Sequence, residues 1–143
     1  MDAVETLRRV PLFEGISDRH LRSLSKWTST RRYDGGRAIV SQGQTGLGLY
    51  CIQSGTVKVT ISGPAGDQEL RQMGPGETFG ELALLDDKPR SATVTALEPT
   101  TAVLLDKSQF RAELSSHPEI ALQILETLVA WLRESDSRSV QSS

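Results

Sequence analysis

The chain contains little cysteine and histidine, and this limits the kinds of site that it can build. Its 143 residues include one cysteine, Cys51, and two histidines, His20 and His117. A single cysteine excludes an internal disulfide and a cysteine-cluster metal site, and two histidines exclude a three-histidine site. Cys51 lies in an apolar run and is interpreted as a small core residue. We expect no metal site and, without an evident nucleophile and base, no catalytic residue and no enzymatic activity.

The chain also lacks an excess of basic residues and a long apolar run. Lys and Arg number 16 against 18 Asp and Glu, which gives a net charge of −2. The basic footprint of a nucleic-acid-binding protein is therefore missing. No apolar run approaches the roughly 18 residues of a membrane span, and the N-terminus has no signal-like segment. We expect a soluble, cytoplasmic protein with neither nucleic acid nor membrane as partner.

What is present suits one globular domain over residues 1–143, with 37% hydrophobic and 24% charged residues. Both ends have helical periodicity. Residues 1–27 predict N-terminal helices, with Ser17 as an N-cap, and residues 107–135 predict C-terminal helices. Residues 136–143 are polar and rich in serine, and we expect them to form a disordered tail.

Residues 28–106 have the pattern of β-structure. Glycines recur, and short runs rich in β-branched residues lie between them. Val57–Ile61 alternates between apolar and polar residues, whereas Leu47–Ile52 and Thr101–Leu105 are more apolar and predict buried strands. Many short strands with frequent turn signals favour a β-sandwich, roll or barrel. The expected fold class is mainly β with flanking helices.

Residues 79–94 form the segment with the clearest chemistry. A short amphipathic helix is expected at about Glu81–Leu85, directly after Gly80. The free N–H groups and the dipole at the start of such a helix attract an anion. Arg90 follows a few residues later, where a guanidinium forms paired hydrogen bonds with a phosphate. Ser91 adds a hydroxyl donor, so the segment predicts a phosphate site.

Glu81 needs a separate explanation, because a carboxylate repels a phosphate. Accepting hydrogen bonds from ribose hydroxyls is one such explanation. Phosphate donors beside a sugar acceptor describe a nucleotide site. The alternative is that Glu81 begins a surface helix and forms an ion pair with Arg90. The residues alone leave both interpretations open.

The segment resembles the phosphate-binding cassette of the cyclic nucleotide-binding domain family. The family pattern is FGEL-A-L, a short spacer, and PR-x-A-T-V. Phe79–Leu85, the spacer Asp86–Lys88 and Pro89–Val94 match it in order. The resemblance covers most of the chain, including Gly36–Val40 and Leu49–Ile52. It implies an eight-stranded antiparallel β-roll, jelly-roll-like, flanked by helices and acting as a sensor module.

The resemblance also implies roles for individual residues. Glu81 would accept from the ribose 2′-hydroxyl, and Arg90 would bind the exocyclic oxygens of the cyclic phosphate. Further contacts to the sugar and phosphate would come from Gly80, Leu82, Ala83, Ser91 and Ala92. Candidate base contacts are Val57, Leu70, Arg71, Trp131 and Ser135. The ligand would be cAMP or cGMP: Ser91 is compatible with both, and cAMP is the preferred interpretation. No cofactor is expected.

The helix expected at residues 118–133 has two apolar stripes. The first stripe is Ile120, Ile124, Leu128 and Trp131, and the second is Leu122, Leu125, Val129 and Leu132. A helix that is apolar on two faces is usually buried on both. The resemblance implies a lid over the base or the seam of a homodimer. The alternative is that both stripes pack on the roll and the N-terminal helices. We expect this helix to move when a cyclic nucleotide binds.

Two further functions stay open at this point. One is a roll that binds no nucleotide and serves as a structural or interaction domain, although the pair of Glu81 and Arg90 argues against it. The other is the sensor fragment of a transcription regulator or a channel. The sequence does not identify the downstream protein in either case.

Overall fold

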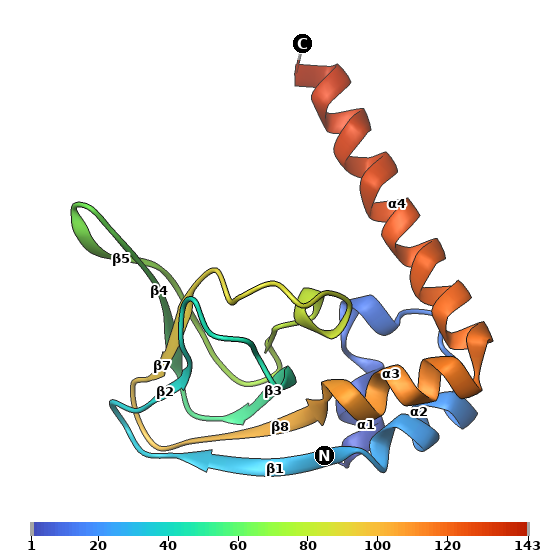
Figure 1. Ribbon diagram of the computed structural model, residues 1–143, viewed down its shortest axis with the longest axis horizontal. Coiled ribbons are helices and arrows are strands. Elements are labelled where there is room, and N and C mark those ends of the chain that lie inside the picture. The colour runs from blue at the N-terminus through green and yellow to red at the C-terminus, as the bar shows by residue number, and fades with distance from the viewer. Residues whose placement is uncertain (1, 143) are drawn as a thin grey trace.

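The computed structural model describes the backbone of residues 2–142 and the side chains of residues 2–137 (Figure 1). The N-terminal part contains α1 (Ala3–Arg8), the 3-10 turn η1 (Pro11–Phe13) and α2 (Asp18–Ser25). The strands are β1 (Thr28–Tyr33), β2 (Ala38–Val40), β3 (Gly48–Ser54), β4 (Val57–Gly63), β5 (Gly66–Met73), β6 (Thr78–Phe79), β7 (Thr93–Ala96) and β8 (Thr100–Asp106). A 3-10 turn, η2 (Leu82–Leu84), interrupts them, and α3 (Lys107–Ser116) and α4 (Pro118–Ser142) follow.

Over residues 2–142, the eight strands form two four-stranded antiparallel sheets. One sheet has the order β1-β8-β3-β6 and the other has the order β2-β7-β4-β5. The β4–β5 hairpin projects from the body of the roll (Figure 1). This architecture confirms the expected fold class, a mainly β roll with flanking helices.

Strands β3 and β8 are covered on both faces, and this explains their continuous apolar sequences. Successive side chains of a strand point to opposite faces. Tyr50 and Leu104 face the interior of the roll, where Tyr50 stacks on Phe79 with ring centroids 5.0 Å apart. Leu49 and Leu105 face a second core, which the strands share with the helices. The prediction of buried strands here is therefore confirmed.

The helices begin where side chains satisfy their first N–H groups. Ser17 accepts a hydrogen bond from the His20 N–H and caps α2, as the sequence predicted. Asp2 and Asp106 cap α1 and α3 in the same way. Pro118 begins α4 at a position where its missing N–H costs no hydrogen bond.

Helix α4 is longer than the sequence predicted. Its backbone is helical to Ser142, where we predicted a disordered tail over 136–143; residue 143 lies outside the described chain. No proline or glycine occurs between Pro118 and the end of the chain, so nothing in the sequence breaks the helix. Within residues 2–142, no helix is both long enough and apolar enough to cross a membrane.

The alternative in which both stripes of α4 pack on the roll and the N-terminal helices is not the observed arrangement. Ile120 and Ile124 are buried against the N-terminal helices and α3, but Trp131 is 37% exposed. The whole second stripe is exposed, namely Leu122, Leu125, Val129 and Leu132. The physical reason is that α4 rises away from the body after its first turns, so only its base meets other elements (Figure 1).

Candidate functional site

The cassette begins where β6 ends and the chain reverses at Gly80. Gly80 has a φ of +90°, a conformation that side chains other than glycine rarely adopt. The expected amphipathic helix is a single 3-10 turn, η2, with one additional i→i−4 bond of 3.2 Å from the Asp86 N–H to the Leu82 carbonyl. The Ala83 N–H already donates to the Gly80 carbonyl at 3.1 Å, so it is not free to bind an anion. The attraction of this short turn for an anion is therefore weaker than predicted.

Arg90 is the dominant cation of the site, and its backbone is fixed on both sides. Its N–H donates to the Gln44 carbonyl and its carbonyl accepts from the Gly43 N–H, each at 2.8 Å. One guanidinium nitrogen donates to the Gly48 carbonyl at 2.7 Å. Among the buried side-chain polar atoms of the described residues, Arg90 Nε alone has no hydrogen-bond partner. A buried donor of this kind is costly unless an acceptor arrives.

The electrostatic surroundings of Arg90 fit an anion-binding guanidinium. Burial lowers the pKa of Arg90 from its ordinary value, whereas the nearby Tyr50 and Glu81 raise it. Burial in turn raises the pKa of Tyr50 to about 12, so the hydroxyl stays neutral. Arg90 is therefore a charged group that has lost part of its hydration. Such a group gains more from an anionic ligand than an exposed arginine does.

Two glycines make the space that the guanidinium occupies. A Cβ atom at Gly46 would collide with the Arg90 guanidinium. A Cβ atom at Gly80 would collide with the guanidinium and also approach the Gly48 carbonyl to 2.7 Å. Gly46 and Gly80 come from different segments of the chain, and together with the Gly48 carbonyl they form a cradle for the Arg90 side chain. The position of Arg90 is therefore built by the fold rather than left to a flexible side chain.

Glu81 lies beside Arg90 without pairing with it. Its carboxylate accepts a hydrogen bond from the Thr78 hydroxyl. In the part of the chain that the structure describes, no ion pair joins Glu81 to Arg90. The alternative in which Glu81 and Arg90 merely neutralise each other is therefore not the observed arrangement. One carboxylate oxygen of Glu81 has a local donor, and the group lines the cavity described next.

Two adjoining cavities meet at Arg90. A cavity of about 460 Å³ is lined by the cassette, including Gly80, Glu81, Arg90 and Ser91. A second cavity, of about 370 Å³, extends from the same residues over apolar side chains of the second sheet, namely Val40, Val59, Ile61, Leu70 and Val94. The pair combines a polar compartment with an apolar one, which is the arrangement that an amphipathic ligand of nucleotide size requires.

Most residues predicted to contact a nucleotide line these cavities: Gly80, Glu81, Leu82, Ala83, Arg90, Ser91, Ala92, Leu70 and Arg71. The other three lie elsewhere. Val57 is fully buried in the core of the roll, so it has no surface for a base. Trp131 and Ser135 lie on the exposed part of α4 and line neither cavity. A contact between these two residues and a base stays a prediction for another position of α4.

Several residues that shape the site were not predicted from the sequence. Gly46 and Gly48 lie more than 40 residues before Arg90, so only the fold brings them together. The two glycines alternate just before and at the start of the apolar strand β3, and this spacing could have suggested that another part of the chain approaches the backbone closely there. Val40 and Ile61 line the apolar cavity, although their sequence context predicts only ordinary core and strand residues.

The cassette is tied to α3 on its outer side. Lys107 donates to the Asp86 carbonyl and forms an ion pair of 2.9 Å with Asp87. Arg111 donates to the Leu84 carbonyl at 3.2 Å and also contacts Asp87. Leu84 is fully buried in the core that contains Phe110 of α3 and Ile120 of α4. A displacement of the cassette therefore reaches α3 through direct contacts, and α4 through the core that Leu84 shares with Ile120.

Comparison with known proteins gives consistent results. The profile of the family described as "Cyclic nucleotide-binding domain" matches residues 30–117. The chain is 32% identical over 134 residues to a CRP-like cAMP-activated global transcriptional regulator of Mycobacterium tuberculosis, covering 93% of this chain and 60% of the relative. The chain thus spans about three-fifths of the length of that relative.

Solved structures support the same assignment. The N-terminal domain of a transcriptional regulator from Streptomyces coelicolor A3(2) superposes with a TM-score of 0.83 and 32% identity, covering 92% of this chain and 95% of that one. The regulatory domain of Toxoplasma gondii PKA, crystallised with cAMP, gives a TM-score of 0.73 at 25% identity, covering 92% of this chain and 49% of that one. On the sequence match and the fold together, this chain belongs to the cyclic nucleotide-binding domain family.

Proposed function

We propose that this chain is a sensor that binds cAMP at Arg90 and passes the signal to α4. The observation that carries the proposal is the buried Arg90 Nε, a donor that lacks a partner within the described residues. Arg90 lines both the polar and the apolar cavity, and its guanidinium lies in a glycine-lined cradle. A cyclic phosphate would supply the missing acceptor and compensate the positive charge.

The remaining parts of the nucleotide have matching surroundings. Glu81 lines the polar cavity and would accept from the ribose 2′-hydroxyl, while Ser91 would donate to the phosphate. The apolar wall with Val40, Val59 and Ile61 would cover one face of the base. This wall offers van der Waals contact and little hydrogen bonding, so it supports adenine, the base in the ligands named for two of the relatives.

The role would be regulatory rather than catalytic. Among the described residues, the linings of the two cavities include neither histidine nor cysteine, and Arg90 and Glu81 lack the partner that a nucleophile or base would need. The ligand is therefore expected to leave unchanged. A net charge of −2 gives no support to direct nucleic-acid binding by this segment.

The proposed output is a change in the position of α4. Leu84 shares a core with Phe110 and Ile120, and the ion pairs of Asp87 link the cassette to α3. The cassette loop is short and closes around the ligand, so it would pull on both helices. The exposed stripe of α4 could then pack against a new surface. A helix with two such positions is the two-state element that a switch requires.

The exposed stripe also supports the predicted homodimer. Leu122, Leu125, Val129 and Leu132 lie on one helix and are all exposed, and a second copy of α4 would cover them in a coiled-coil-like contact. Sedimentation equilibrium tests this: the mass of a dimer is expected for the wild type and that of a monomer after Leu125→Glu. A monomeric wild type would remove this part of the proposal.

Calorimetric titration of the full chain with cAMP, cGMP and 5′-AMP tests the proposed function directly. One molar equivalent of cAMP is expected to bind, with weaker binding of 5′-AMP, whose phosphate is not cyclic. Tighter binding of cGMP than of cAMP would support the sensor function but assign guanine as the preferred base. Failure of both cyclic nucleotides to bind would favour the alternative function, a structural or interaction roll.

A further inference from the structure

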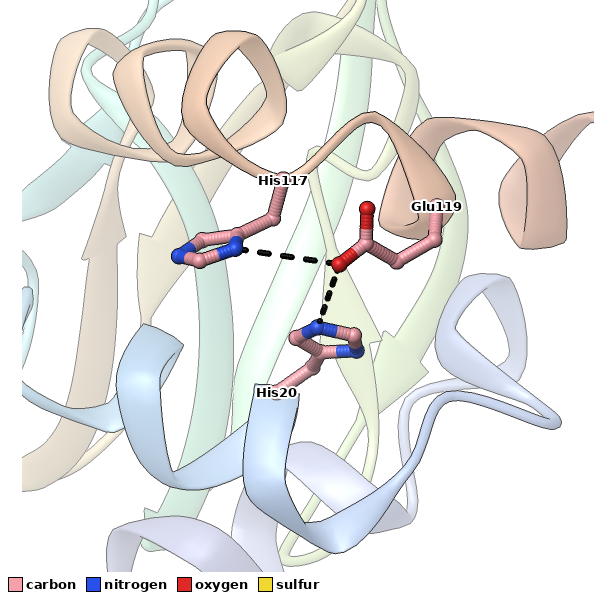
Figure 2. Close-up of side chains that lie close together, drawn as sticks. All are labelled: His20, His117 and Glu119. Carbon is pink, nitrogen blue, oxygen red and sulfur yellow. Dashed lines mark hydrogen bonds and ion pairs between the residues drawn. The ribbon is translucent and has the colours of Figure 1, made fainter.

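The two histidines of the chain meet at the joint between α3 and α4. His20 comes from α2, His117 from the end of α3, and Glu119 from the first turn of α4. Figure 2 shows both imidazole rings directed toward the same carboxylate oxygen. The two rings lie with their centroids 5.5 Å apart. This cluster was not predicted from the sequence, because the two histidines lie far apart along the chain.

Local structure determines where each of these side chains points. The Ser17 cap begins α2, so His20 lies in the first turn, where its side chain reaches α4. His117 ends α3 with a non-helical backbone (φ −133°, ψ 76°), and Pro118 starts α4 immediately afterwards. Glu119 is therefore held close to both histidines by the sharp change of direction between the two helices.

The donor atoms have the spacing of a metal site. His20 Nε2 lies 3.1 Å and His117 Nδ1 lies 3.7 Å from the same oxygen of Glu119. All three donor atoms lie within 4.8 Å of one another. Zinc bonds of about 2.0–2.2 Å place tetrahedral ligand atoms roughly 3.3–3.5 Å apart. We propose that His20, His117 and Glu119 bind a divalent transition-metal ion, with Zn²⁺ as the expected ion and water as the fourth ligand.

Each histidine also has a partner on the ring nitrogen that faces away from the proposed ion. His20 Nδ1 lies 3.1 Å from the Ser17 hydroxyl. His117 Nε2 lies 3.9 Å from Glu113, whose carboxylate is fixed by Ser23 and by the indole of Trp27. Outer partners of this kind orient ligating histidines and favour the tautomer that leaves the inner nitrogen free. The cluster therefore has an outer shell as well as three ligands.

The surrounding charges and competing ligands are compatible with this site. Glu119 supplies the carboxylate of the site and contacts both histidines through one oxygen. The chain's one thiol, Cys51, is buried, and burial raises its pKa to about 12, which removes it as a competing ligand. Arg19 lies 3.5 Å from His20 Nε2. It is an exposed side chain that must withdraw when the ion binds.

A bound ion would connect α2 directly to the start of α4. It would add a metal link at the joint from which α4 projects, and so would restrict the angle of the helix. Metal binding to the folded state also raises the stability of that state by mass action. The consequence is a higher Tm in the presence of Zn²⁺, and slower amide exchange in the first turns of α4.

Titration of the full chain, without a polyhistidine tag, with Zn²⁺ by calorimetry and with Co²⁺ by visible absorption tests the site. One equivalent is expected to bind. His117→Gln and Glu119→Gln are exposed changes that preserve the fold, and each is expected to weaken binding at least about tenfold. Glu126→Gln, an exposed carboxylate further along α4, is the matched control and should bind as the wild type does. Arg19→Ala should bind more tightly.

Circular dichroism of each variant separates lost ligation from lost folding. His20→Asn, which keeps a polar side chain in the partly enclosed position, completes the set and is expected to lose the Co²⁺ spectrum while it stays folded. Two results would overturn the proposal: no zinc binding by the wild type, or equal binding by the wild type, His117→Gln and Glu119→Gln. Neither result depends on whether the chain binds a nucleotide.

Discussion

The cassette and the outer part of α4 each leave a group without a partner, but the two groups differ in kind. In the cassette it is one polar atom, Arg90 Nε, buried and surrounded by glycines. On α4 it is a broad apolar stripe from Leu122 to Leu132, open to solvent. The backbone around Arg90 is fixed by hydrogen bonds to distant segments, whereas α4 contacts the body mainly near its base.

This difference separates recognition from output. A buried donor in a fixed cradle selects one acceptor at one position, and therefore suits a small anion. An exposed helix face has no fixed partner and gains from any apolar surface that covers it, so it suits a change of position. The following predictions test whether recognition depends on the cradle and whether output depends on α4.

The largest effect is expected from Arg90→Ala. The change removes the charged donors of the cradle, and losing one partner of a desolvated charged contact costs about 2–5 kcal/mol. Affinity for cAMP should therefore fall about 30- to 4,000-fold in a calorimetric titration. Arg71→Ala is the matched control, because Arg71 lines both cavities but is exposed on β5. Equal losses of cAMP affinity in the two variants would contradict the distinction between Arg90, which the fold holds in place, and the exposed Arg71.

Glu81→Gln should reduce affinity for cAMP by about 1.5–3 kcal/mol, because it weakens a hydrogen bond between a sugar hydroxyl and a charged group. The same change should matter much less for 2′-deoxy-cAMP, which lacks that hydroxyl. The four dissociation constants form a double-mutant cycle. If both ligands lose equal affinity, Glu81 acts on the cassette itself and not on the ribose.

Gly80→Ala should reduce affinity about tenfold or more, since the new Cβ displaces the Arg90 guanidinium. Gly76→Ala is a matched control: Gly76 has a φ of +88°, similar to +90° at Gly80, but a Cβ there meets nothing within 4 Å. Both variants should lose about 1–2 kcal/mol of stability through backbone strain, and Gly80→Ala should lose more because its Cβ also meets the Gly48 carbonyl. Chemical unfolding measures that shared loss, and only Gly80→Ala should also lose affinity.

Ligand binding should slow amide exchange across residues 118–135 by several-fold and should change the fluorescence of Trp131. Trp131 is 37% exposed without ligand, so a new contact would alter its surroundings. Trp27→Phe removes the second indole and isolates the signal. Exchange that slows in residues 80–92 but not in α4 would show that recognition occurs without this output.

The smallest effect is expected from Asp87→Asn. The Lys107 ammonium, and then Arg111, lower the pKa of Asp87 below its ordinary value. A lowered pKa in the folded state stabilises the fold above the unfolded pKa, which is about 4, and this contribution disappears as the pH falls through the folded pKa. Urea unfolding should therefore show a slight loss of stability at pH 7 and none in strong acid. A difference that persists in acid would assign another role to Asp87.

The sequence predicted best what depends on neighbouring residues. The cassette is continuous from Phe79 to Val94, so its motif could be identified, and the strands β3 and β4 follow local apolar patterns. Ser17 caps α2 for the same reason, since a cap needs only the next few residues. The fold class could be predicted because many short strands with turns between them have few alternative architectures.

The rest depends on contacts that no local pattern specifies. Gly46 meets Arg90, and His20 meets Glu119, only after the chain has folded. Val57 was predicted at the base from the family resemblance, but its side chain points into the core of the roll. The end of α4 was mispredicted because polar residues continue a helix as well as they end it. The direction of α4 could not be predicted, because an apolar stripe does not say which surface covers it.

The central claim is that Arg90 Nε donates to the ligand, and its own N–H resonance tests this most directly. In ¹⁵N-labelled protein the resonance is assigned by its loss in Arg90→Lys and followed while cAMP is added. We predict a downfield shift that is complete at one equivalent of cAMP, since the orphan donor gains a charged acceptor. Saturating cAMP binding that leaves the Arg90 Nε–H resonance unmoved would contradict the account.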